Sequence, residues 1–151
     1  MKALDIAGEL IHPLNFVLFV RLLGRMALLR LRLRLQTPQE LLARLPRVQR
    51  RSEGDCDWHR IERIARYSHW IARGLLAPSK PCLLRSLTRY HFYSEMGLSV
   101  RIHFGVKPDL KRRIEGHSWL TLEGRPLCEV GRALEQYQSI FSYPEGMSGV
   151  D

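Results

Sequence analysis

The spacing of apolar residues changes once along this chain, near Gly97. Between residues 58 and 96, apolar residues recur at three- and four-residue steps, which is typical of helices packed on a core. From Val100 to Val106, apolar and polar residues alternate, as in a strand with one buried face. Gly97 suits the left-handed position that ends a helix. The sequence therefore predicts an α+β fold, with a helical N-terminal half and a small antiparallel sheet.

One cysteine lies at the expected start of a helix. Cys82 follows Pro81 and precedes an apolar run at helical spacing, which places its thiol in the first turn. Unpaired backbone N–H groups and the helix dipole stabilise a thiolate there. His117 opens an alternating segment downstream, and Glu129 follows twelve residues later. Papain-like enzymes place a nucleophile on a helix and a base and an orienting acid on the following sheet in this way.

Three motifs occur in the same order as in a known family. They are CLLRSL at 82–87, VRIHFGV at 100–106 and HSWLTLEGRP at 117–126. With them, the chain resembles the transglutaminase-like leader peptidases of lasso-peptide biosynthesis, specifically the stand-alone protease half of a split B protein. The resemblance implies a papain/transglutaminase-like fold and a catalytic triad of Cys82, His117 and Glu129. The third member is more usually aspartate in this family, so Glu129 departs from the pattern by one methylene.

The same resemblance implies an activity and partners. The protein would be a cysteine peptidase that removes the leader from a ribosomally made lasso-peptide precursor, through a thioester that water hydrolyses. Its partners would be the precursor's leader peptide, a separate leader-recognition protein and the macrolactam-forming cyclase, with no cofactor and no metal. Two other functions stay open: a catalytically silent basic binding module on the same fold, and a thiol acyltransferase that passes the acyl group to an amine.

Net charge and cysteine content limit the partners and the cellular compartment that we expect for the protein. Its 151 residues carry a net charge of +9, which predicts an acidic partner. The arginines lie among leucines without a nucleic-acid-binding signature, so we expect no nucleic acid. Three widely spaced cysteines form no disulfide framework and suit a reducing compartment. No signal-peptide pattern is present, and the apolar run at 16–20 is too short to span a bilayer, so we expect a cytoplasmic protein.

The chain divides by composition into three parts. Residues 1–50 form a basic, leucine-rich helical segment, 54–145 form the peptidase core and 146–151 form a flexible tail. Leucine and arginine alternate at 29–35, but both are strong helix formers, so we expect a helix over 3–35. The leucines of this helix either pack on the domain or a partner protein, or lie at an anionic inner-membrane surface.

Local signals place further helices. Thr37 and Glu40 form a capping box at the start of a short helix. Asp57 is the N-cap of a helix over 58–76, and we expect a weak helix over 134–141. The predicted buried face of the 58–76 helix consists of Trp58, Ile61, Ala65, Ser68, Ala72 and Leu75.

Residues 117–122 and 126–130 predict a hairpin around Glu123-Gly124. With a strict two-residue loop, Ser118 would face Glu129 and His117 would point to the opposite side. For His117 and Glu129 to share a face, the loop must hold three residues with a bulge. We therefore predict a bulged hairpin, and we expect Cys128 to be a structural residue on the face opposite Glu129.

Two further assignments complete the candidate residues. The oxyanion would be received by the backbone N–H of Cys82 and by a second donor, for which Ser79, Lys80 and the Trp119 indole are candidates. A metal site built on Cys56, His59 and His69 is disfavoured, because zinc sites usually need a second close pair of ligands. We expect His91 and His103 to be packed or solvated side chains.

Overall fold

The computed structural model describes residues 8–44, 57–76, 81–108, 114–128 and 134–144. These residues form helices and a four-stranded antiparallel sheet with strand order β3-β2-β1-β4. The helices are α2 (Pro13–Leu35), α3 (Pro38–Ala43), α4 (Trp58–Trp70), the π-helix η2 (Ile71–Leu76) and α5 (Pro81–Glu95). The strands are β1 (Val100–Pro108), β2 (Ile114–Leu122), β3 (Arg125–Pro126) and β4 (Gln138–Tyr143).

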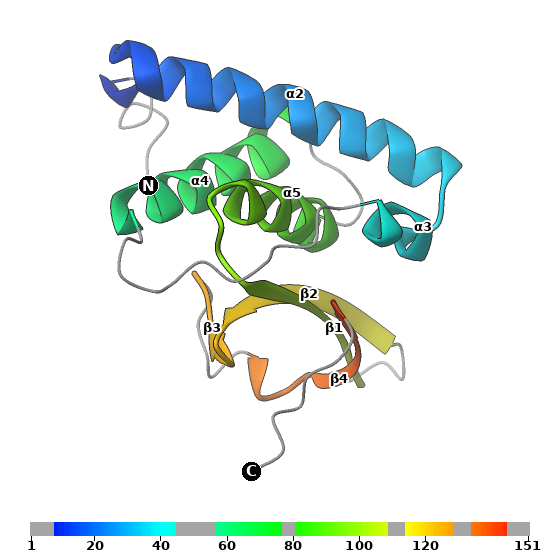
Figure 1. Ribbon diagram of the computed structural model, residues 1–151. Helices are drawn as coiled ribbons and strands as arrows, with labels where there is room; N and C mark the ends of the chain where they lie inside the picture. The colour runs from blue at the N-terminus through cyan, green and yellow to red at the C-terminus, as the bar shows by residue number, and fades with distance from the viewer. Residues whose placement is uncertain (1–7, 45–56, 77–80, 109–113, 129–133, 145–151) are drawn as a thin grey trace.

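The elements form three layers, which confirms the predicted α+β fold. Helices α4 and α5 lie between α2 on one side and the curved sheet on the other (Figure 1). Leu22 and Met26 of α2 have no exposed surface and belong to the same core cluster as Leu87 of α5 and Ile102 of β1. The inner face of α2 is therefore part of the core, so removing this helix would open it.

Helix ends follow their local sequence signals. Thr37 Oγ1 accepts from the Glu40 N–H at 3.3 Å, and Glu40 Oε2 accepts from the Thr37 N–H at 3.0 Å, which is the predicted capping box. Asp57 Oδ1 caps α4 by accepting from the Arg60 N–H at 3.0 Å. After α5, Gly97 has a φ of 82°. Its predicted role as the left-handed residue after the helix is confirmed.

The helix predicted over 58–76 differs from the prediction in two ways. It is α-helical to Trp70 and continues as a π-helix to Leu76. Trp58 and Leu75, placed on the buried face by their spacing, are 55% and 50% exposed. They lie at the two ends of the segment, whereas its central residues contact the core. Ile64 and Tyr67 complete the buried face instead.

The predicted helix at 134–141 is wrong, because residues 138–143 form the edge strand β4. Its backbone pairs with β1, with Phe141 opposite Phe104 and Tyr143 opposite Ile102. The register shifts between Phe104 and Gly105. Pairing with β1 satisfies backbone groups along a whole strand, and this outweighs the weak helical propensity of the segment.

The predicted bulged hairpin loop is also wrong. Leu122 pairs with Arg125, which leaves only Glu123 and Gly124 in the loop. Their φ values are 52° and 78°, as a type I′ turn requires, and this turn matches the natural twist of a hairpin. The backbone departs from extended geometry later, at Cys128, where φ is 57°.

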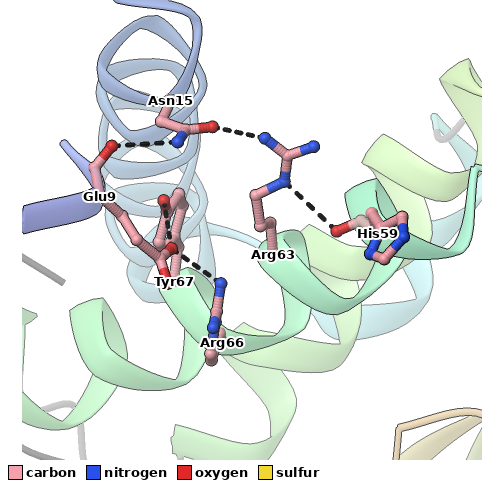
Figure 2. A network of polar contacts seen from close by, with 6 residues as sticks. All are labelled: Glu9, Asn15, His59, Arg63, Arg66 and Tyr67. Atoms are coloured by element: carbon pink, nitrogen blue, oxygen red, sulfur yellow. Dashed lines mark hydrogen bonds and ion pairs between the residues drawn. The ribbon is translucent and has the colours of Figure 1, made fainter. Parts of the chain in front are cut away.

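A polar network joins the start of α2 to α4 (Figure 2). The Glu9 carboxylate accepts from the Tyr67 hydroxyl at 2.9 Å and pairs with Arg66 at 2.7 Å. Arg63 donates to the side-chain oxygen of Asn15 at 2.5 Å. Burial, followed by the hydrogen bond to Glu9, raises the pKa of Tyr67 to about 12. This network fixes α2 on the helical layer that carries the site.

Candidate active site

The first turn of α5 lies against the edge of β2. Cys82 is the second residue of α5 and is half-buried. The hydroxyl of Ser86, one helical turn later, donates to the Ser118 carbonyl at 2.9 Å. The Ser118 hydroxyl donates to the Ser86 hydroxyl at 3.3 Å. A backbone hydrogen bond from Ser118 also reaches the Cys82 thiol. Helix α5 thus hydrogen-bonds to the Ser118 backbone of β2, and these bonds hold Cys82 against the sheet.

The structure brings Cys82 and His117 together. The His117 imidazole lies close enough to the Cys82 thiol to lower its pKa, although the two residues lie on different elements. Burial raises the pKa of the Cys82 thiol, but the hydrogen bond and charge of His117 lower it. Backbone hydrogen bonds from Leu83 and Ser118 lower it further, and the net pKa is below the ordinary thiol value. The sulfur is therefore placed to become a thiolate beside an imidazole.

Two aromatic rings pack beside the His117 imidazole. Its ring centroid is 6.2 Å from that of Trp119, with a 16° interplanar angle, and 5.0 Å from that of Tyr137. Trp119 stacks in turn on His103 at 5.4 Å. His103 bonds to Thr121 at 2.9 Å, and burial lowers its pKa. His103 is thus a packed side chain, as predicted.

A glycine on β1 makes room for the Trp119 ring. A Cβ atom at Gly105 would lie 2.7 Å and 2.8 Å from two carbons of the Trp119 ring and 2.9 Å from the Gln138 carbonyl. Real Cβ contacts are essentially never so short. Gly105 also pairs with His117 in the sheet register. The glycine therefore lets the indole lie flat over β1, where it supports the imidazole.

A charged cluster near His117 was not identified from the sequence. The Tyr137 hydroxyl donates to Glu115 at 2.9 Å, and the Lys107 ammonium lies 3.2 Å from the same carboxylate and 4.8 Å from the Tyr137 ring centre. Hydrogen bonds from Tyr137 and Lys107 lower the pKa of Glu115. Glu115 lies two residues before His117 on β2, so alternation along the strand could have placed the two side chains on the same face. Tyr137, about twenty residues further on, gave none.

Several sequence candidates fall outside the described residues. These include Glu129, the predicted orienting acid, and Ser79 and Lys80, two candidate oxyanion donors. Cys128 is exposed and has its sulfur 3.9 Å from the Tyr93 hydroxyl. Because Cys128 leaves the extended conformation, strand alternation does not determine the direction of the next side chain.

Two further histidines, His69 and His91, have side-chain partners. His69 contacts the Arg85 guanidinium at 2.7 Å, and His91 contacts Glu95 at 3.2 Å and Arg25 at 3.2 Å. Cys56, the cysteine of the disfavoured metal site, is not among the described residues. Within the described ranges, no three metal-ligating side chains gather as an ion would need.

Comparison with known families assigns the fold. The family model described as the transglutaminase-like superfamily matches residues 19–142, which run from α2 to β4. The chain belongs to this superfamily. Transglutaminase-like domains commonly act as cysteine peptidases or transglutaminases, and both activities use a thiol and form an acyl-enzyme. Neither a curated protein nor a solved structure matches the chain.

Proposed function

We propose that this transglutaminase-like protein is a cysteine peptidase that removes the leader from a lasso-peptide precursor. The observation that carries the proposal is the position of the His117 imidazole beside the Cys82 thiol, at the junction of α5 and β2. The lowered thiol pKa adds support, because the thiolate is the nucleophilic form. The assignment to lasso-peptide leaders rests on the three sequence motifs that resemble that family.

The first half of the proposed reaction forms a thioester. His117 takes the thiol proton, and the Cys82 sulfur attacks the scissile carbonyl carbon. The carbonyl oxygen becomes an oxyanion, which the backbone N–H of Cys82 in the first turn of α5 receives. When the carbon–nitrogen bond breaks, His117 returns the proton to the leaving amine.

The second half releases the acyl product. His117 takes a proton from water, and the resulting hydroxide attacks the thioester and displaces the Cys82 thiolate. Each step needs the imidazole in one orientation, which a carboxylate sets through the other ring nitrogen. We assign this role to Glu129 on the family resemblance, although the two-residue hairpin loop counts against it. Trp119 and Tyr137 pack beside the imidazole and so restrict the remaining rotation.

The proposed partners are the leader peptide, a separate leader-recognition protein and the cyclase that closes the macrolactam. The net charge of +9 favours an acidic peptide over a basic one. We place the reaction in the cytoplasm, where a catalytic thiol stays reduced, with α2 in peripheral contact with the inner membrane.

Incubation with the precursor and the recognition protein encoded beside it tests the proposal. Mass spectrometry should show two fragments whose masses sum to the precursor plus one water. The Cys82→Ala variant should give none, whereas Cys128→Ala, which removes an exposed thiol, should retain the activity. A fragment that carries an added amine instead of water would assign acyl transfer. Equal cleavage by Cys82→Ala would reject a thiol mechanism.

A further inference from the structure

Helix α2 is apolar on its outer face as well as on its inner face. Its inner face, which includes Leu22 and Met26, is fully buried in the core. The outer face, which we call the outer stripe, exposes large apolar side chains to solvent by between 39% and 77%. They are Phe16, Val17, Val20, Leu28, Leu31 and Leu35. Soluble monomers rarely leave so continuous an apolar surface uncovered.

The outer stripe runs the whole length of the helix. Val17, Val20, Leu28, Leu31 and Leu35, with Gly24 between them, follow one another at three- and four-residue steps. This spacing keeps them on one side of a helix that is about 35 Å long. Figure 1 shows α2 as the outermost layer, with α4 and α5 on its inner side and the sheet beyond them. The stripe thus faces away from the candidate active site.

Arginines border the outer stripe on both flanks. Helix α2 contains five arginines and no acidic residue. At about 100° per residue, Arg32 and Arg34 fall on opposite sides of Leu31. The other three hold the fold: Arg21 pairs with Glu95 at 3.1 Å, Arg25 contacts His91 at 3.2 Å, and Arg30 donates to the Leu76 carbonyl. The stripe is therefore an apolar band with an arginine on each side near its C-terminal end.

The charge pattern selects the kind of surface that covers the stripe. A second copy of α2 would bring no acidic residue to Arg32 and Arg34, since the helix contains none, and this disfavours a symmetric pairing. Anionic lipid fits both features, because aliphatic side chains enter the acyl boundary while arginines reach the phosphates. No helix among the described residues is long and apolar enough to cross a bilayer. The fitting geometry is thus a helix lying in the plane of the interface.

We propose that the outer stripe of α2 docks on the surface of an anionic membrane, with Val20 and Leu31 inserted at its centre and Arg32 and Arg34 paired with lipid phosphates. The docked protein presents its sheet and the Cys82 side of α5 to the aqueous phase. This docking does not depend on the proposed peptidase activity, and either can fail without the other.

Vesicle flotation of the full chain tests the docking. The protein should float with phosphatidylglycerol-containing vesicles and not with pure phosphatidylcholine vesicles, and added salt should reduce the bound fraction. A Val20→Glu, Leu31→Glu variant should lose at least about tenfold in apparent affinity, because it places charge where acyl chains contact the helix. An Arg32→Gln, Arg34→Gln variant should lose about 25-fold in affinity for the anionic vesicles, since each arginine near such a surface contributes about a factor of five.

A matched control distinguishes docking through α2 from nonspecific adsorption to the vesicles. Ile114→Glu with Ile140→Glu makes the same chemical change at side chains that are 78% and 65% exposed on the sheet, and it should leave flotation unchanged. Circular dichroism should show all variants folded. Equal loss in this control, or no flotation of the unmodified chain, would overturn the proposal. Light scattering that shows a dimer broken by Val20→Glu would overturn it in favour of a second copy.

Discussion

The hydroxyl of Ser86 hydrogen-bonds the backbone carbonyl of Ser118, thirty-two residues away in the chain, at 2.9 Å. Both residues are buried. Ser86 lies one turn after Cys82 on α5, and Ser118 follows His117 on β2. Together with the hydrogen bond from the Ser118 hydroxyl to Ser86, this contact attaches the helix that carries the thiol to the strand that carries the imidazole.

Replacing Ser86 by alanine should loosen this attachment. The Ser118 carbonyl loses its buried donor, which costs about 1–3 kcal/mol in the free energy of unfolding. Ser94→Ala is the matched control on the same helix, because the Ser94 hydroxyl is buried without a hydrogen-bond partner among the described residues. Its unfolding free energy in urea should stay close to that of the unmodified protein. Equal effects of the two substitutions would show that the Ser86 contact is not stabilising.

Substitution of Gly105 by alanine should displace the Trp119 ring. The new methyl group would lie within 2.8 Å of the ring carbons, and overpacking of this kind costs about 1–3 kcal/mol. Gly116→Ala on the neighbouring strand is the control, since its Cβ meets nothing within 4 Å. Near-ultraviolet circular dichroism should change for Gly105→Ala and not for Gly116→Ala. An unchanged spectrum and stability for Gly105→Ala would contradict the close packing.

Tyr137 should act through both its ring and its hydroxyl. Tyr137→Phe keeps the ring beside His117 but removes the donor to Glu115, so the pKa of Glu115 should rise toward its ordinary value. Carboxyl carbon NMR titration measures this change. Tyr137→Ala also removes the ring contact and should slow alkylation of Cys82 more than Tyr137→Phe does. Identical alkylation rates in the two variants would exclude a role for the ring.

Tyr67 should make stability depend on alkaline pH. Its pKa is about 12 in the folded protein against about 10 when unfolded, so its hydroxyl stabilises the fold below pH 10. Above pH 10 the unfolded chain loses this proton first, and the contribution disappears as the pH approaches 12. The difference in unfolding free energy between the unmodified protein and Tyr67→Phe should therefore shrink across this range. A difference that stays constant would contradict the hydrogen bond to Glu9.

Short-range signals explain what the sequence predicted. The capping box at Thr37, the N-cap at Asp57 and the helix end at Gly97 each depend on a few neighbouring residues. Cys82 and His117 were found because a thiol at a helix start and a downstream histidine form a pattern of residue types and order. Whether the two side chains meet depends on the sheet edge at Ser118, which lies outside such patterns.

Long-range pairing explains what the sequence did not predict. Strand β4 forms because β1 offers it backbone partners, although its own residues favour a weak helix. The left-handed φ of Cys128 is rare for a residue other than glycine, so the end of regular hairpin geometry had no sequence signal. The aromatic support of His117 comes from Trp119 on its own strand and from Tyr137, which precedes β4.

In the proposed mechanism, His117 makes the Cys82 sulfur ionic. The most direct test is the rate of iodoacetamide alkylation at Cys82 against pH, read by peptide mass spectrometry in the unmodified protein and in His117→Ala. In the unmodified protein the midpoint should lie below the ordinary thiol pKa of about 8.5. In the variant the midpoint should be higher, because burial still raises the thiol pKa and His117 no longer lowers it. Superimposable profiles would contradict this role of His117.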